Sequence, residues 1–387
     1  MNRNSGKGIE VLVKPVSYGC NLACGYCFYK KTSGLYPSGL NPLEKTHLMT
    51  DTVLEKMIAE CMEYSNGKPA IFSWQGGEPT LAGLDFFKKA VGFQSKYGKP
   101  GQIISNSVQT NGILIDTNWT GFFKKYNFFI GISLDGPEEA NGVYRQYPSG
   151  KSCYRETMQA VELLKKEEID FNVLVTIGAK TAKDPKKLYE FFLSYGLKYL
   201  QFIPALDRAE GAGGTNGGGQ MPSFAPAPEA YGDFLCGLFD CWWNGGKPKA
   251  SVRFFDNLCE IAFGMEPTAC IFKKQCGSYM VIEHNGDAYP CDLFVGREWK
   301  LGNILETPAG ELIAKARESF GKLKAAGHAD CRGCEWNFVC NNGCLWNRWV
   351  KNGNINDRDY FCAAYRRFFN HSYGRLQGAA KSAKRKQ

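Results

Sequence analysis

The chain has 387 residues, of which 44% are hydrophobic and 14% aromatic, and this composition excludes an intrinsically disordered protein. No stretch is apolar for long enough to span a bilayer, and residues 1–8 lack the apolar segment of a signal peptide, so we expect a cytoplasmic protein without membrane contact. The formal net charge is +9, but no acidic residue follows Asp359, which predicts a basic, partly frayed tail rather than a nucleic-acid-binding surface.

Apolar segments that alternate with amphipathic ones predict six β-strands joined by helices. This alternation favours a parallel α/β sheet with right-handed crossovers, as an open doubly wound layer or as a partial barrel. Ligands bind at the carboxyl ends of the strands in both architectures. The expected strands are residues 10–16, 70–74, 103–108, 128–133, 170–177 and 199–204, and the expected helices are 51–64, 84–97, 117–126, 154–167 and 184–195.

Three cysteines, Cys20, Cys24 and Cys27, follow the first expected strand in a C-x3-C-x2-C spacing. Three thiolates can bind three irons of a [4Fe–4S] cluster and leave the fourth iron open to a non-protein ligand. A zinc site would normally need a fourth protein ligand, and no histidine lies nearby in the sequence. Two further loops, 75–79 and 134–137, follow the second and fourth strands, so all three loops should meet at one edge of the sheet.

A glycine-rich stretch, 209–220, and a proline-rich stretch, 221–228, interrupt this pattern and predict a linker or a loop before a helix over 230–243. Beyond them, segments 278–283 and 287–290 predict a hairpin around Asn285-Gly286, with Cys291 just past its second strand.

Eight cysteines crowd the last third of the chain, which is the number that two four-thiolate clusters require. Cysteine spacing alone does not separate iron from zinc, so a pair of structural zinc sites is an alternative. Because the cytoplasm keeps thiols reduced, disulfides are not expected. The eight are Cys270, Cys276, Cys291, Cys331, Cys334, Cys340, Cys344 and Cys362; the remaining Cys61, Cys153, Cys236, Cys241 and Cys259 are expected to be small buried side chains.

Together these motifs resemble those of the anaerobic sulfatase-maturating enzymes, which are radical S-adenosylmethionine (SAM) enzymes with a SPASM domain. The resemblance runs from about residue 11 to about residue 367. It implies a partial (β/α)6 radical SAM barrel and a C-terminal SPASM domain with two auxiliary iron–sulfur clusters. The matching segments are 17–22, 27–29, 75–81, 109–112, 133–137 and 200–204; the implied division is a barrel over 1–208, a linker and bridging helix over 209–250, a SPASM domain over 251–367 and a basic tail over 368–387.

The resemblance also implies roles for individual residues. Cys20, Cys24 and Cys27 would bind the cluster that cleaves SAM. Two auxiliary clusters would be bound by Cys270, Cys276, Cys291 and Cys344, and by Cys331, Cys334, Cys340 and Cys362. The implied SAM contacts are Tyr26, Gly77, Ser133, Arg145 and Leu206.

The implied activity is the oxidation of a cysteine or serine of an unfolded sulfatase, in a Cys/Ser-x-Pro-x-Arg motif, to Cα-formylglycine. Asp292, directly after Cys291, would be the general base, and Gln75 would bind the substrate backbone. The implied cofactors are three [4Fe–4S] clusters and SAM, with ferredoxin or flavodoxin as electron donor. The alternative is a radical SAM enzyme that matures a ribosomally made peptide by thioether formation or epimerisation, although no peptide-recognition domain precedes the first strand.

Overall fold

The computed structural model describes residues 8–37, 47–210 and 219–385, and these form two compact units. The first unit combines the N-terminal part up to Ser133 with residues 146–171 and 277–321, and the second contains residues 134–145, 172–276 and 322–387. Both units are therefore built from separated stretches of the chain. Most of the glycine-rich stretch 209–220 lies outside the described residues.

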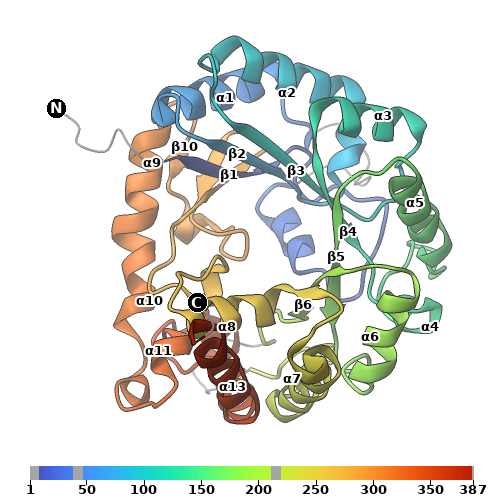
Figure 1. The fold of residues 1–387 in the computed structure, drawn as a ribbon. Helices are drawn as coiled ribbons and strands as arrows, with labels where there is room; N and C mark the ends of the chain where they lie inside the picture. The colour runs from blue at the N-terminus through green and yellow to red at the C-terminus, as the bar shows by residue number, and fades with distance from the viewer. Residues whose placement is uncertain (1–7, 38–46, 211–218, 386–387) are drawn as a thin grey trace. The chain divides into compact units, whose positions relative to one another are not determined.

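The first unit is organised on a mixed sheet whose strands follow the order β10-β9-β8-β1-β2-β3-β4. Strands β1 to β4 pair in parallel, β8 adds to β1 in parallel, and β9 and β10 follow as antiparallel strands. The helices α1, α2 and α3 cover one side of β1, β2 and β3 (Figure 1). The bounds are β1 Ile9–Lys14, β2 Ala70–Trp74, β3 Ile104–Thr110, β4 Phe129–Ser133, β8 Met280–Glu283, β9 Asp287–Tyr289, β10 Gly302–Asn303, α1 Asp51–Ser65, α2 Leu84–Tyr97, α3 Thr117–Tyr126, α5 Tyr154–Lys166 and α9 Ala309–Lys315.

Side-chain caps and aromatic packing explain why these helices begin and dock where they do. Thr50 accepts a hydrogen bond from Val53 N at the start of α1, and Asp116 accepts two from the first turn of α3, so both residues are N-caps. Trp74 of β2 is fully buried and meets the ring of Phe87 on α2 at a centroid distance of 5.5 Å.

The second unit contains the parallel strands β5, β6 and β7 and most of the C-terminal helices. Its longest helix, α13, packs against α7 and α8, as Figure 1 shows. The bounds are β5 Phe171–Ile177, β6 Tyr199–Pro204, β7 Ser251–Val252, α4 Glu138–Asn141, α6 Pro185–Ser194, α7 Pro228–Trp243, α8 Arg253–Phe263, α10 Lys322–Ala326, α11 Asn337–Cys340, α12 Leu345–Asn352 and α13 Cys362–Lys384.

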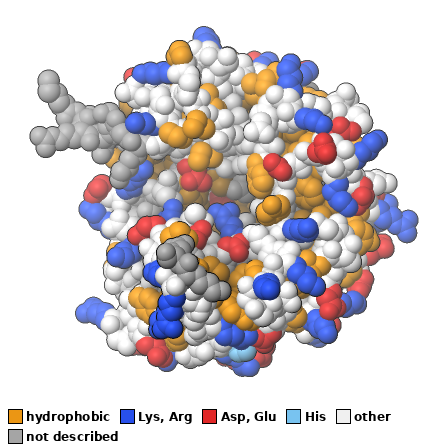
Figure 2. Space-filling model, in the orientation of Figure 1, with side chains coloured by type: hydrophobic (Ala, Val, Ile, Leu, Met, Phe, Trp, Pro, Cys, Tyr) orange, Lys and Arg blue, Asp and Glu red, His pale blue; other side chains and the backbone are white. Residues whose placement is uncertain are grey.

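The expectation of a frayed basic tail is wrong, because α13 continues without a break to Lys384. Its apolar side buries Phe368, Phe369 and Leu376. Its cations also have partners: Arg375 pairs with Asp240 of α7 at 2.8 Å. On the face shown in Figure 2, Lys and Arg side chains are interspersed with Asp and Glu. The excess positive charge therefore belongs partly to a packed helix.

The five cysteines outside the expected clusters differ in burial. Cys61 and Cys153 are fully buried as expected, whereas Cys236, Cys241 and Cys259 are only partly buried, so the expectation is wrong for these three. No helix of the described residues combines the length and apolar character needed to cross a membrane.

Candidate functional site

The cysteine loop leaves the carboxyl end of β1, at the edge of the sheet where ligands were expected. Cys20, Cys24 and Cys27 are free thiols and all partly buried. The backbone N–H of Leu22 donates to Cys20 Sγ at 3.3 Å. Burial raises the pKa of the Cys20 thiol, so a bound cation would be needed to favour the thiolate at neutral pH. This donor set suits an iron–sulfur cluster, whose sulfur ligands accept backbone hydrogen bonds.

The loop after β2 is joined to the cysteine loop through its backbone. Gly77 N donates to Ser17 O at 2.6 Å, and Glu78 N donates to Gly19 O at 2.8 Å. A Cβ atom on Gly77 would lie only 1.9 Å from Gly19 O, so no other residue fits here. Gln75, which is half-buried, is fixed by a hydrogen bond from its N–H to Val13 O at 2.9 Å.

Glu78 connects this loop to the loop after β3. Its Oε1 accepts hydrogen bonds from Thr80 N at 3.1 Å, Thr80 Oγ1 at 2.7 Å and Thr110 Oγ1 at 2.7 Å. Its Oε2 accepts from Asn111 N at 2.8 Å. Asn111 in turn donates to Asn21 Oδ1 of the cysteine loop at 2.8 Å. One buried carboxylate therefore holds three loops of the first unit together, a role that the sequence analysis missed.

The structure places the other expected SAM contacts in both units, and those roles stay predictions. In the first unit, Tyr26 is nearly buried and Ser133 Oγ accepts a hydrogen bond from Gln109 Nε2 at 2.9 Å. In the second unit, Arg145 forms a buried ion pair with Asp135 at 3.2 Å. Leu206, also in the second unit, is buried.

Asp292, the expected base, lies directly after Cys291 and just past the β8–β9 hairpin. The hydroxyl of Tyr279 donates to Asp292 Oδ1 at 3.0 Å and also lies 3.5 Å from Cys291 Sγ. This tyrosine, which the sequence analysis did not single out, therefore orients the carboxylate and contacts the neighbouring thiol. The side chain of Asp292 is half-buried, so it keeps access to solvent or to a bound substrate.

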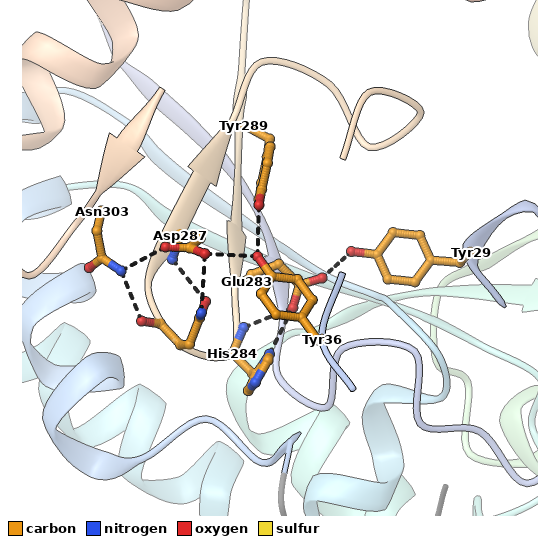
Figure 3. Close-up of polar contacts among 8 residues, drawn as sticks. Tyr29, Tyr36, Glu283, His284, Asp287, Tyr289 and Asn303 are labelled. Atoms are coloured by element: carbon orange, nitrogen blue, oxygen red, sulfur yellow. Dashed lines mark hydrogen bonds and ion pairs between the residues drawn. The ribbon is translucent and has the colours of Figure 1, made fainter. Parts of the chain in front are cut away.

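A buried polar network connects the cysteine loop to the same hairpin (Figure 3). The hydroxyl of Tyr29 donates a short hydrogen bond to Glu283 Oε1, and Glu283 Oε2 accepts from the backbone N–H of His284 at 3.0 Å. Glu283 is fully buried, and Tyr29 is 2% exposed. On the far side of the network, Tyr36 Oη contacts Tyr289 Oη at 2.8 Å and donates to Asp287 Oδ2 at 3.0 Å.

Lys14 adds a buried cation to this network. It is the last residue of β1, its β8 partner is Glu283, and its Nζ lies 4.2 Å from the centre of the Tyr29 ring. Burial lowers the pKa of Lys14, whereas the charges of Asp292, Glu283 and Cys27 act in the opposite direction. Lys14 thus adds a buried positive charge beside Tyr29 and its strand partner Glu283, which no sequence motif indicated.

The second unit holds seven of the eight late cysteines, all of them free thiols. Burial raises the pKa of Cys276 to about 11 and that of Cys344 to about 12. Two buried cations accompany them. Lys324 Nζ donates to the carbonyl oxygen of Cys270 at 3.0 Å, and Arg348 is 1% exposed. Positive charge beside buried sulfur suits thiolates that bind iron.

A single metal ion finds no ready site in the part of the chain that the structure describes, where no three Cys, His, Asp or Glu side chains gather closely enough to hold one. A cubane cluster arranges its thiolates around a cage of four irons, so its ligands stand further apart than those of one ion.

Comparison with known proteins gives matches over nearly the whole chain. Residues 15–192 match the radical SAM superfamily, and residues 270–335 match the iron–sulfur cluster-binding domain called SPASM. The chain is 36% identical to the serine-type anaerobic sulfatase-maturating enzyme of Bacteroides thetaiotaomicron, over 94% of this chain and 89% of the relative. It is also 36% identical to the cysteine-type anaerobic sulfatase-maturating enzyme of Clostridium perfringens, over 97% of this chain and 99% of the relative.

A solved structure shares the fold. Native anSMEcpe with bound AdoMet and the Cp18Cys peptide superposes with a TM-score of 0.86 at 35% identity, covering 97% of this chain and all of that one. The expected fold, a radical SAM partial barrel with a SPASM domain, is confirmed by this match and by the two family matches.

Proposed function

The chain belongs to the anaerobic sulfatase-maturating enzymes of the radical SAM superfamily, and we propose that it oxidises a cysteine or serine of a sulfatase polypeptide to Cα-formylglycine. Its sequence identity is 36% both to a relative named as serine-type and to one named as cysteine-type, so sequence identity favours neither serine nor cysteine as the target. The substrate is an unfolded segment with a Cys/Ser-x-Pro-x-Arg motif.

The proposed cluster ligands are eleven cysteines. Three lie in the radical SAM region, five in the SPASM region, and three in the segment after residue 335. Support comes from their free thiols and from the buried cations beside the late group. All sixteen cysteines lie in the part of the chain that the structure describes and none of them forms a disulfide. A reducing compartment such as the cytoplasm suits this chemistry. The SAM-cleaving cluster takes Cys20, Cys24 and Cys27; one auxiliary cluster takes Cys270, Cys276, Cys291 and Cys344, and the other takes Cys331, Cys334, Cys340 and Cys362.

When bound, the SAM-cleaving cluster and SAM supply a 5′-deoxyadenosyl radical, and the auxiliary clusters supply an acceptor for one electron. The chain positions SAM through the backbone of Gly77, whose tight packing leaves no room for a side chain. Ser133 and Arg145 bind its carboxylate by a hydroxyl and a guanidinium. Tyr26 and Leu206 contact the adenine, and Gln75 binds the substrate backbone. A low-potential protein such as ferredoxin or flavodoxin delivers the first electron.

Asp292 removes the proton that the oxidation releases. After a hydrogen atom leaves the substrate Cβ, the resulting radical loses one electron, and the thiol or hydroxyl proton passes to the Asp292 carboxylate. A carbon–sulfur or carbon–oxygen double bond forms as a result. With cysteine, water then replaces the sulfur of the thioaldehyde and releases hydrogen sulfide; with serine, the aldehyde is already the product.

The observation that carries the base assignment is the contact of Tyr279 with both Asp292 and Cys291. It places the carboxylate beside a proposed ligand of the electron-accepting cluster, so proton and electron can leave the substrate at one place.

The test is mass spectrometry of two peptides, one with Cys-x-Pro-x-Arg and one with Ser-x-Pro-x-Arg, after anaerobic incubation with reconstituted enzyme, SAM and a reductant. Formation of formylglycine in at least one peptide, with one 5′-deoxyadenosine for each product, is expected. Cleavage of SAM without a change in either peptide would contradict the proposal and favour maturation of a different peptide, by a thioether bond or by epimerisation.

A further inference from the structure

One donor of a buried guanidinium in the second unit has no hydrogen-bond partner among the described residues. The guanidinium of Arg348 uses Nε to donate to Asn342 O at 2.8 Å. Its Nη2 donates to Asn342 O at 2.6 Å and to Lys324 O at 3.0 Å. Its Nη1 is fully buried and has no hydrogen-bond partner among the described residues.

Such an orphaned donor is costly in a folded protein. Leaving a buried polar group unpaired costs about 1–3 kcal/mol, and more when the group is charged. The other two nitrogens fix the plane of the guanidinium, so Nη1 cannot rotate toward another acceptor without breaking those bonds. An acceptor from outside the described part of the polypeptide would remove this cost.

The backbone contacts of Arg348 lie among segments that carry proposed cluster cysteines, because Lys324, whose carbonyl Arg348 binds, also donates to Cys270 O. Arg348 lies on α12, the helix that begins directly after Cys344, and its N–H bonds to Cys344 O at 3.2 Å. Burial lowers its pKa, whereas the charges of Cys331, Asp359, Cys344 and Cys276 act in the opposite direction. Cys276 and Cys344 belong to one proposed auxiliary cluster, and Cys331 belongs to the other.

The carboxylate in this group has its own donors. Asp359 Oδ2 accepts from Cys344 N at 2.9 Å and Asn347 Nδ2 at 3.1 Å, and its Oδ1 accepts from Phe361 N at 2.8 Å. Lys324 is also committed, because its Nζ donates to Cys270 O and Ile271 O. The sulfur atoms of a cluster remain as acceptors for Nη1.

We propose that Arg348 donates a hydrogen bond from Nη1 to sulfur of an auxiliary cluster and thereby raises that cluster's reduction potential. Hydrogen bonds to cluster sulfurs and nearby positive charge both stabilise the reduced, more negative state. Arg348 is then a positioning residue for the electron step: the electron lost by the substrate radical passes to a cluster whose reduced form this guanidinium stabilises. The inference rests on the ligand sets given under Proposed function.

The test measures reduction potentials, so it does not depend on activity. Full-length protein with Cys20, Cys24 and Cys27 changed to Ala retains the auxiliary clusters alone, and its anaerobic potentiometric titration is followed by electron paramagnetic resonance. Arg348→Gln is expected to change the ratio of oxidised to reduced cluster at a fixed potential at least tenfold, which is a shift of about 59 mV to lower potential for one electron. Arg348→Lys, which keeps the charge but not the planar fork, should shift it less.

Arg366→Gln is the matched control, because Arg366 is exposed on α13; it should titrate at the parent potential. If the Arg348→Gln protein keeps its iron and its auxiliary clusters have the same reduction potentials as in the parent protein, the proposal is wrong. If the Gln protein loses iron, Arg348→Lys decides in its place, and an unchanged potential there overturns it equally. If the unmodified enzyme makes no formylglycine, the proposed function fails, while these potentials still decide the role of Arg348.

Discussion

Glu78 offers a quantitative test of how the first unit shapes the proposed SAM site. Changing Glu78 to Gln keeps the size of the side chain but replaces one oxygen with an NH2 group. The Glu78 carboxylate is the acceptor in each of its four described side-chain hydrogen bonds. Three of them go to Oε1, and the fourth, from Asn111 N, goes to Oε2. The amide oxygen can serve the three donors, but its NH2 group then faces Asn111 N–H, and that bond is lost.

Losing one hydrogen bond to a charged group costs about 1.5–3 kcal/mol. Because Glu78 fixes the backbone that follows Gly77, we expect this cost to appear as weaker SAM binding, roughly 10- to 150-fold in Kd. The affinity is measured by anaerobic calorimetry on reconstituted enzyme. Glu55→Gln is a suitable control, because the partners of this α1 carboxylate among the described residues are Lys96 and Tyr97 on α2.

A double-mutant cycle sharpens this test. Thr110→Val removes one of the four donors, so Glu78→Gln should cost less in the Thr110→Val protein than alone. If SAM binds to the Glu78→Gln protein within twofold of the unmodified enzyme, the reasoning that Glu78 holds the loop is wrong.

Three further results are expected. Asp292→Asn should leave SAM cleavage largely intact while formylglycine production falls at least 100-fold, consistent with the size of general-base effects, and equal losses in both assays would contradict the base role. Glu283→Gln should lower the free energy of unfolding by about 3 kcal/mol, because Lys14 loses the charge of its β8 partner, and an unchanged urea midpoint would refute this. Anaerobic reconstitution should incorporate about twelve irons, the sum of three cubanes, and a colourless protein with zinc would refute the cluster assignment.

Local sequence patterns predicted the repeating elements well. Strands β2 and β6 and helices α2 and α3 have the predicted bounds, and the hairpin turn at Asn285-Gly286 joins β8 to β9 as expected. These segments combine a clear apolar period with caps or turn residues, so local chemistry and tertiary packing favour the same structure.

The basic helix and the buried cations were missed because charge is a poor guide to burial. Residues of α13 look like a solvated tail, yet Phe368, Phe369 and Leu376 provide an apolar side and α7 provides carboxylates. In the sequence, Lys14 at the end of a strand and Arg348 in a helix look like ordinary solvent-exposed cations. Their burial depends on partners far away in the sequence, which no local window contains.

The pairing of β8 with β1 brings the hairpin that precedes the proposed base against the cysteine loop. Parallel register sets Lys14 opposite Glu283, and Tyr29 of the cysteine loop closes the contact by its bond to Glu283. The hairpin that begins with β8 then continues to Cys291 and Asp292. Slipping the register by one residue would turn Lys14 and Glu283 to opposite faces of the sheet and carry Asp292 out of line with the cysteine loop. The strand pairing therefore fixes the position of the proposed base relative to Cys27, although the two lie far apart along the chain.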